Sequence, residues 1–319
     1  MLFLSEQTIK EAVSMKDVID AIDATYEIYQ SGKFQMPQRM QVKEGDNTLL
    51  LMPCFTGDAI GTKLVTIFPN NESLPTLHGL VVLNDSETGD IQGILNGTIL
   101  TGMRTGAIGG SGVRHLAKED ASSLAIIGTG VQGLYQAIAA VTERPINDIY
   151  LFNRSPEKIE SFTKSLQEWI GKDVSINPCH TVEEALHEAD IVITATTSNN
   201  PVLPDKQNLF ENKLIIGVGS FQPTMREFPE SVFKAADQVI VDTEHAIDES
   251  GDIATPIEKG WVDRESIITM SDLIANKAEV KEDKTVVLKT TGMALFDVVV
   301  ANLMYRKAKE KGAGTKLTL

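Results

Sequence analysis

A glycine-rich segment in the middle of the chain has the spacing G-x-G-x-x-G, and its residues are Gly128, Thr129, Gly130, Val131, Gln132 and Gly133. It directly follows an apolar run at 124–127 and precedes a helix-like stretch that begins near Val131. At such a turn the first glycine allows a tight bend, the second lets the backbone approach a pyrophosphate, and the third permits close helix–strand packing. The helix N-terminus adds amide donors and a positive dipole. We therefore expect a bound dinucleotide here rather than a glycine-rich turn without a ligand.

The residues after the next apolar run indicate which dinucleotide is bound. NAD-preferring domains usually carry Asp or Glu at this point to hold the ribose hydroxyls. Here the sequence after Phe152 reads Asn153, Arg154 and Ser155. These side chains offer hydrogen-bond donors, and arginine matches the geometry of a phosphate group. The pattern favours NADP(H), with NAD(H) possible, over the alternative that Arg154 is an exposed turn residue.

Small hydroxyl residues follow the apolar run at 190–193, among them Thr196 and Thr197. Ligands of doubly wound folds bind at the carboxyl ends of the strands. Taken alone, the segment is typical of an ordinary Ser/Thr turn. Its position relative to the glycine motif favours contact with the cofactor.

Three cations in the first third of the chain, Arg39, Lys63 and Arg104, each stand among apolar or small residues. Cations in such surroundings are seldom fully buried without a partner. For any one of them, pairing with Asp or Glu is the better expectation. The alternative is that they converge on a substrate carboxylate, which an arginine can hold through two hydrogen bonds.

From about residue 123 onward, short apolar runs alternate with helix-like stretches, which predicts a Rossmann-type doubly wound parallel sheet in an α/β fold. Helices at 156–169 and 182–189 would cover this sheet. The expected strands are Ser123–Ile127, Asp148–Phe152, Val174–Asn177, Asp190–Thr194, Lys213–Val218, Asp237–Val241 and Ser266–Thr269.

The first 115 residues have a different pattern, which predicts an α+β domain. An amphipathic helix at 15–31 is followed by extended segments near 39–53, 61–69, 77–84 and 91–95. The helical stretch 292–311 is expected to return to this domain. We therefore predict an α+β domain from residues 1–115 plus 290–319, and a dinucleotide-binding domain from residues 116–289.

The composition limits the classes of partner. A formal charge of −15 disfavours nucleic acid and anionic membrane surfaces, which would repel the protein. No apolar run approaches the ~18 residues of a membrane span, and the N-terminus has no basic segment followed by a long apolar one, so we expect a cytoplasmic protein. Cys54 and Cys179 form no C-x-x-C pair, and the histidines have no metal-binding spacing, so no metal is expected.

The chain resembles the ornithine cyclodeaminase/μ-crystallin family over nearly its whole length. The matching residues are Leu51-Met52-Pro53, Gly61-Thr62-Lys63, the stretch from His78-Gly79 to Gly106-Ala107, 127–132, 223–227 and 292–297. The resemblance implies a homodimer whose first domain holds a small amino or imino acid substrate and the dimer interface. It also implies that Arg39, Lys63 and Arg104 bind the substrate carboxylate.

Departures from the family pattern favour one branch of it. Family cyclodeaminases carry Glu where this chain has Leu50, and an Asp-containing segment where it has 219–223. Ring closure and loss of ammonia are suited to placed carboxylates, so their absence disfavours ornithine cyclodeamination. The form Ser-Phe-x-Pro-x-Met-Arg-Glu at 220–227 is similar to ketimine and Δ1-pyrroline-2-carboxylate reductases.

The resemblance thus implies an NADPH-dependent reductase that converts Δ1-pyrroline-2-carboxylate to L-proline or reduces a related ketimine. The alternatives are an ornithine cyclodeaminase, an alanine-type dehydrogenase, and a μ-crystallin-like protein that binds NADPH and a small ligand without fast turnover. Lys63 is a catalytic candidate, and Ser220 and Thr197 are candidates to orient a water that supplies the proton. Asp297 could serve the same chemistry or simply be an N-terminal helix charge.

Overall fold

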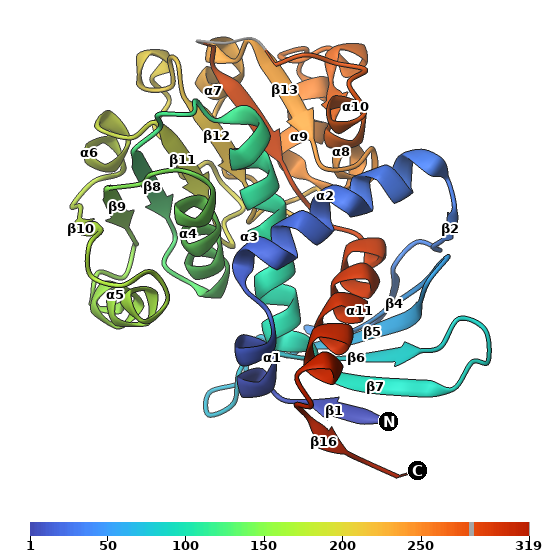
Figure 1. The fold of residues 1–319 in the computed structure, drawn as a ribbon. Helices are drawn as coiled ribbons and strands as arrows, with labels where there is room; N and C mark the ends of the chain where they lie inside the picture. The colour runs from blue at the N-terminus through green and yellow to red at the C-terminus, as the bar shows by residue number, and fades with distance from the viewer. Residues whose placement is uncertain (281–283, 319) are drawn as a thin grey trace. The chain divides into compact units, whose positions relative to one another are not determined.

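The computed structural model describes residues 1–280 and 284–318, which form two compact units. One unit consists of Met1–Arg104 and Met293–Leu319, and the other of Thr105–Gly292. The chain passes from the first unit to the second between Arg104 and Thr105, inside helix α3 (Gly97–Leu116), rather than at residue 115. Figure 1 shows the course of the chain through both units.

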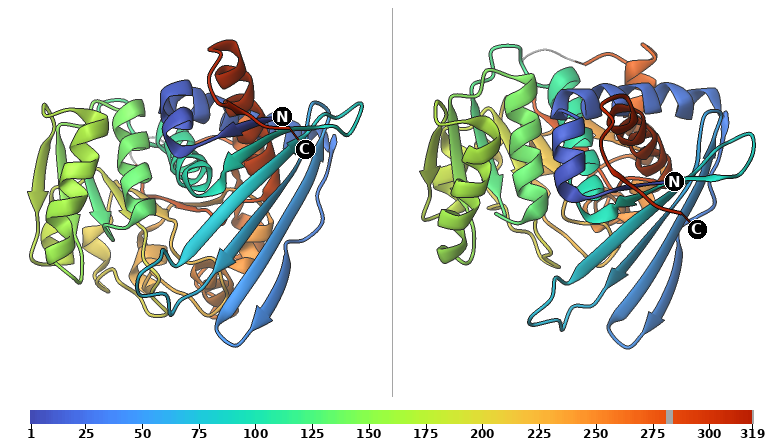
Figure 2. Two further views of the ribbon diagram at one scale, coloured as in Figure 1. Left: turned by 90° about the horizontal axis from the view of Figure 1, so that it is seen from below. Right: turned by 60° about the horizontal axis from the view of Figure 1, so that its bottom comes forward.

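The first unit is built on an eight-stranded sheet with the order β16-β1-β7-β6-β5-β4-β2, and β3 pairs with β4. Its helix α11 (Ala294–Glu310) packs on helix α2 (Met15–Ser31) and on strands β1, β4, β5 and β6. Figure 2 shows the long strands as one twisted layer. The strands are β1 (Leu2–Leu4), β2 (Phe34–Gln35), β3 (Met40–Glu44), β4 (Asn47–Thr56), β5 (Ile60–Ile67), β6 (Leu77–Asn84), β7 (Ile91–Asn96) and β16 (Thr315–Lys316), and the remaining helix is α1 (Glu6–Ala12).

Alternation along these strands gives the sheet two different faces. Cys54 is buried while its neighbour Phe55 is half exposed, and Val81 is buried while Leu80 is 36% exposed. Successive side chains of a strand point to opposite faces, so the buried set packs under the helices and the exposed set faces outward. At Gly61 an added Cβ would lie 2.9 Å from Val298 of α11, which shows how closely the helix approaches β5.

The second unit holds a parallel eight-stranded sheet with the order β10-β9-β8-β11-β12-β15-β13-β14. This confirms the predicted Rossmann-type fold, since the order reverses at β8. The strands are β8 (Ser123–Ile127), β9 (Asp148–Phe152), β10 (Ser175–Pro178), β11 (Ile191–Thr194), β12 (Leu214–Gly217), β13 (Gln238–Val241), β14 (Ile268–Thr269) and β15 (Val286–Lys289). The helices after α3 are α4 (Val131–Glu143), α5 (Glu157–Ile170), α6 (Val182–His187), α7 (Glu230–Ala235), α8 (His245–Glu249), α9 (Gly251–Glu258) and α10 (Met270–Ile274).

Strand β15 was missing from the predicted set although it lies inside the sheet, between β12 and β13. Its apolar run is only three residues long and ends at Lys289, so the sequence there has too few apolar positions to predict a central strand. Lys289 is nevertheless fully buried. A buried lysine in the middle of the sheet requires a charged partner.

Glycines let the second half of α3 pack closely within the second unit. A Cβ at Gly106 would lie 2.5 Å from the Tyr135 carbonyl oxygen, and one at Gly112 would overlap Leu288. Gln136 of α4 donates from Nε2 to the Thr105 carbonyl at 2.8 Å. The glycines therefore trade helix propensity, up to about 1 kcal/mol each, for close helix packing.

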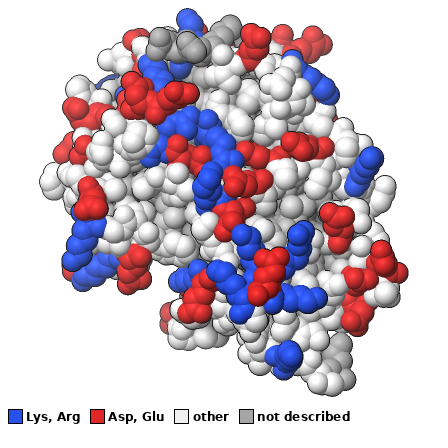
Figure 3. Space-filling model, in the orientation of Figure 1, with Lys and Arg blue, Asp and Glu red and all other residues white. Residues whose placement is uncertain are grey.

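On the face drawn in Figure 3, acidic and basic side chains are interspersed. None of the helices in the described residues combines the length and the apolar character that crossing a bilayer requires.

Candidate active site

The glycine motif forms the turn between β8 and α4, as its spacing predicts. Gly128 has φ +108°, and a Cβ there would lie 2.6 Å from the Ala195 carbonyl oxygen. A Cβ at Gly133 would overlap the Gly128 carbonyl, whereas nothing lies within 4 Å of one at Gly130. Only the second glycine therefore borders open space, which is where a pyrophosphate would approach the backbone.

The N-terminus of α4 suits an anion. Gly130 is its N-cap, and no side chain caps the helix. The first-turn amides and the helix dipole therefore favour a negatively charged ligand. Gln132 Oε1 is buried without a hydrogen-bond partner in the described residues, so a polar ligand would also satisfy this atom. These features fit a dinucleotide pyrophosphate.

A cavity of about 620 Å³ lies beside the motif at the carboxyl ends of β9 and β10. Asn153 donates from Nδ2 to the Thr129 hydroxyl and accepts from the Ser155 amide at 3.3 Å, so it ties the two turns together. Arg154 lines the cavity and is exposed. The cavity has an apolar lining from Phe152 and Ile159, so it can take an adenosine with Arg154 near its ribose.

The hydroxyl residues after β11 have different surroundings. Thr197 is exposed, whereas Thr196 donates from its amide and its hydroxyl to Glu227 Oε1, at 2.7 and 2.8 Å. Ser220 is fully buried, and its hydroxyl donates to the Met225 carbonyl at 2.7 Å and lies 2.8 Å from Ser250 Oγ. The Ser220 hydroxyl is therefore engaged with its own loop, and its predicted role in orienting a water stays a prediction.

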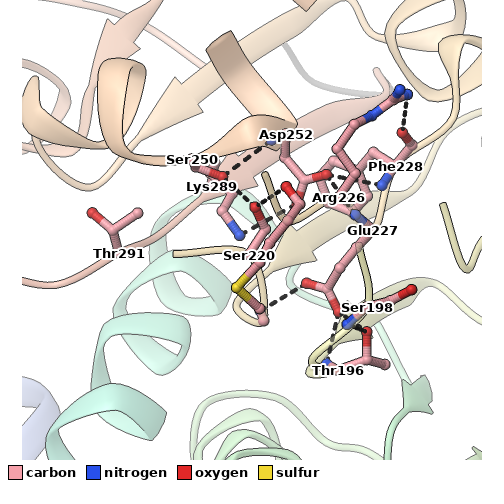
Figure 4. A network of polar contacts seen from close by, with 12 residues as sticks. Thr196, Ser198, Ser220, Arg226, Glu227, Phe228, Ser250, Asp252, Lys289 and Thr291 are labelled. Carbon is pink, nitrogen blue, oxygen red and sulfur yellow. Dashed lines mark hydrogen bonds and ion pairs between the residues drawn. The ribbon is translucent and has the colours of Figure 1, made fainter. Parts of the chain in front are cut away.

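Three of the buried charged residues in this unit form a cluster that had no predicted role: Glu227, Asp252 and Lys289 (Figure 4). Lys289 Nζ lies 3.4 Å from Asp252 Oδ2, and Glu227 bonds to the loops after β11 and β12. Burial raises the pKa of Glu227, and the charge of Lys289 opposes that rise. Of these three residues only Glu227 lies in a segment that resembles the family, 223–227, and nothing in the sequence pointed to the other two.

In the first unit, Asp297 joins two of the three predicted cations. Lys63 Nζ lies 2.8 Å from Asp297 Oδ2, and Arg104 Nε lies 2.9 Å from Asp297 Oδ1. The side chains of Lys63, Arg104 and Asp297 are 3%, 8% and 0% exposed, so this is a buried ion cluster. Strand β5 supplies the lysine, α3 the arginine and the first turn of α11 the aspartate.

The cluster keeps an excess of positive charge. The pKa of Lys63 is lowered to about 8, mainly by burial and to a smaller extent by the charges of Arg104 and Arg39, while Asp297 opposes this shift. Arg39 directly precedes β3 and is partly exposed. Lys63 and Arg104 share one carboxylate, so the pairing interpretation holds for these two, and the cluster keeps one positive charge in excess, which suits a further anion.

The described residues contain no group of three His, Cys, Asp or Glu side chains arranged to hold a metal ion. A buried cationic cluster and a dinucleotide-binding fold together suit redox chemistry on a small carboxylic acid.

Known proteins share this chain's fold and sequence over its full length. The chain is 35% identical to the Delta(1)-pyrroline-2-carboxylate reductase of Bacillus thuringiensis subsp. konkukian, over 99% of each protein. It is 30% identical to the Thermococcus litoralis Delta(1)-pyrroline-2-carboxylate reductase solved with NADH and L-proline, with a TM-score of 0.92 over 99% of this chain and 100% of that one. An archaeal alanine dehydrogenase dimer with bound NAD is 28% identical, with a TM-score of 0.90 over 100% and 99%.

The family model of the ornithine cyclodeaminase/mu-crystallin family matches residues 1–312, which is almost the entire chain. The match includes the cation cluster, the glycine motif and the start of α11. The protein therefore belongs to the ornithine cyclodeaminase/mu-crystallin family.

Proposed function

We propose that the protein is an NAD(P)H-dependent reductase of a small cyclic imino acid, with Δ1-pyrroline-2-carboxylate as substrate and L-proline as product. The observation that carries the proposal is the buried cluster of Lys63, Arg104 and Asp297, whose positive excess suits one carboxylate. The full-length relatives named Delta(1)-pyrroline-2-carboxylate reductase support the choice of substrate.

The cationic residues divide the work on the substrate. Arg104 donates from Nε to Asp297, and its terminal nitrogens bind the substrate carboxylate. Arg39 supplies a second guanidinium. Lys63, with a pKa of about 8, is mostly protonated at neutral pH and can release a proton without great cost. We assign to Lys63 Nζ the proton that the imine nitrogen gains during reduction.

The second unit binds and orients the cofactor, which supplies the hydride when it is bound. Residues 128–133 hold its pyrophosphate, while Asn153, Arg154 and Ser155 face its adenosine ribose. Thr196 and Thr197 follow β11, on the other side of β8 from β9, and would contact the nicotinamide half.

A cofactor-oxidation assay tests this function. Purified protein should oxidise NADPH or NADH when Δ1-pyrroline-2-carboxylate is added, with L-proline as the product. The same protein should oxidise NAD(P)H much more slowly with pyruvate plus ammonia, which tests the alanine dehydrogenase alternative. With NAD+ or NADP+ and ornithine it should form little proline, which tests the cyclodeaminase alternative. Proline and ammonia formed from ornithine would overturn the proposal, and binding of both ligands without turnover would favour a μ-crystallin-like binding protein.

The preference for NADP(H) over NAD(H) is tested at Arg154. In Arg154→Ala we expect kcat/KM for NADPH to fall about 10- to 100-fold and that for NADH to change less than about threefold, since a charge-assisted contact to the 2′-phosphate is worth about 1.5–3 kcal/mol. Lys158→Ala, an exposed cation of α5 outside the cavity lining, is the matched control. Equal losses with both cofactors would show that Arg154 does not read the phosphate.

We further propose that the protein is a homodimer that pairs through the outward face of the first unit's sheet. This face exposes apolar side chains, including Met40 (58%), Val42 (55%) and Phe55 (51%). Exposed apolar side chains gathered on one face are typical of an interface. Light scattering should give twice the chain mass of 34.8 kDa, and Phe55→Glu should lower it toward one chain. A wild-type mass of one chain at micromolar concentration would contradict the dimer.

A further inference from the structure

A buried carboxylate connects the two loops at the centre of the carboxyl edge of the parallel sheet. Glu227 Oε1 accepts from the Thr196 amide and hydroxyl, at 2.7 and 2.8 Å, and Oε2 accepts from the Gly219 amide at 2.7 Å. Thr196 follows β11 and Gly219 follows β12. A Cβ at Gly219 would overlap Thr196, so only glycine allows this approach.

The carboxylate is part of a charged cluster with an odd number of charges. Asp252 Oδ1 accepts from the amides of Glu227 and Phe228, at 2.7 and 2.9 Å, and Asp252 Oδ2 lies 3.4 Å from Lys289 Nζ. All three charged side chains are fully buried (Figure 4). The three donors to Glu227, the two amides that donate to Asp252 and the Lys289 charge favour the ionised form of both acids. With one protonated lysine, the cluster then has a net charge of −1.

The contacts of the described residues give this cluster no second cation that would balance its charge. Lys289 Nζ and Asp252 Oδ2 make no hydrogen bond in the described residues, apart from their ion pair. Arg226, the neighbouring cation, points away, with its Nη2 on the Phe228 carbonyl at 3.0 Å and its guanidinium 5.5 Å from the Trp261 ring. An excess buried charge is costly unless it is neutralised by something outside the cluster.

The order of strands indicates what neutralises it. The pyrophosphate site lies at the end of β8, and the adenosine cavity lies at β9 and β10 on one side of it. A dinucleotide that lies across the switch point therefore places its other half over β11 and β12. Those are the strands whose following loops Glu227 connects. The nicotinamide ring is cationic when oxidised and neutral when reduced.

We propose that Glu227 and Asp252 act as positioning residues whose shared negative charge makes the site prefer the oxidised over the reduced cofactor. The proposal rests on the dinucleotide-binding role assigned above. A site that favours the oxidised form assists hydride donation to an imine, because the cofactor becomes a cation as the hydride leaves. A unit charge acting across about 10 Å of protein with an effective dielectric constant of about 20 changes an equilibrium roughly tenfold.

The test is the ratio of dissociation constants of the oxidised and reduced cofactors, measured by titration calorimetry without substrate. In Glu227→Gln and in Asp252→Asn, the ratio Kd(NADP+)/Kd(NADPH) should rise about tenfold, which corresponds to about 1.4 kcal/mol. Asp252→Asn retains an oxygen to accept from both amides, so it removes the charge with little change in hydrogen bonding. NAD+ and NADH should show the same trend.

Two controls separate charge from loop geometry. Glu227→Asp retains the charge but is too short for all three bonds, so it should weaken both cofactor forms and leave the ratio within about twofold of wild type. Glu188→Gln removes an exposed carboxylate just before β11, at the opposite edge of the sheet, where solvent screens it. It should change neither constant.

Each outcome has one meaning. If Glu227→Gln and Asp252→Asn weaken both forms equally, the cluster only shapes the loops and the inference is wrong. Should Glu227→Gln not fold, by circular dichroism, the Asp252→Asn ratio alone decides. Wild-type protein that binds neither NADP(H) nor NAD(H) would instead refute the proposed function.

Discussion

Replacing Arg104 with alanine should lower kcat/KM for Δ1-pyrroline-2-carboxylate by about 100- to 1,000-fold. Truncating one partner of a buried, hydrogen-bonded charge pair costs about 2–5 kcal/mol. Here the substitution removes the guanidinium that binds the substrate carboxylate. The loss should appear in both KM and kcat/KM, because Arg104 binds the substrate throughout the reaction. Steady-state kinetics with the imine as the varied substrate measure the effect.

Cofactor binding distinguishes a substrate ligand from a general loss of structure. In Arg104→Ala the Kd of NADPH should remain within about twofold of wild type, because the glycine motif and the adenosine cavity belong to the other unit. Arg306→Ala removes an exposed arginine of α11 in the same unit and should leave the kinetics unchanged. A collapse of NADPH binding in Arg104→Ala would contradict the assignment.

The sequence predicted the nucleotide-binding fold because its strands are buried on both faces. Residues such as those of β11 and β12 are continuous apolar runs, and glycines or polar turns mark where they end. β15 escaped prediction because Lys289 interrupts its apolar character, and only the buried Asp252 in the folded protein makes that lysine possible. A local pattern carries no information about a partner 37 residues away in the chain.

The same limit applies to the candidate site. The types of Lys63 and Arg104 and their apolar neighbours predicted that they need a partner, yet the partner, Asp297, is 193 residues beyond Arg104. Ser220 shows a further limit of a local pattern. A hydroxyl after a strand suggests a ligand contact, but the chain folds back so that the Met225 carbonyl takes that hydroxyl.

Asp297→Asn is expected to destabilise the protein by about 3–5 kcal/mol. Lys63 and Arg104 would remain buried without a carboxylate between them, and an uncompensated buried charge carries a cost of this size. Denaturant unfolding of the wild type and the variant measures the difference. Glu6→Gln removes an exposed carboxylate that pairs with Lys10 in the same unit, and should cost less than about 1 kcal/mol.

The pH dependence of activity tests the effect of the Asp297 charge on the pKa of Lys63, independently of stability. Only protonated Lys63 can bind the carboxylate and give a proton, so kcat/KM of the wild type should fall as the pH rises through about 8, the pKa of Lys63. Asp297 raises that pKa, and its removal must lower it. The alkaline limb of kcat/KM in Asp297→Asn should therefore lie at a lower pH than in wild type. Activity that the variant has lost at neutral pH should be recovered on acidification. A limb that stays in place would mean that Lys63 is not the group that titrates, and the proton would have to come from another donor, such as a water held by the exposed hydroxyl of Thr197.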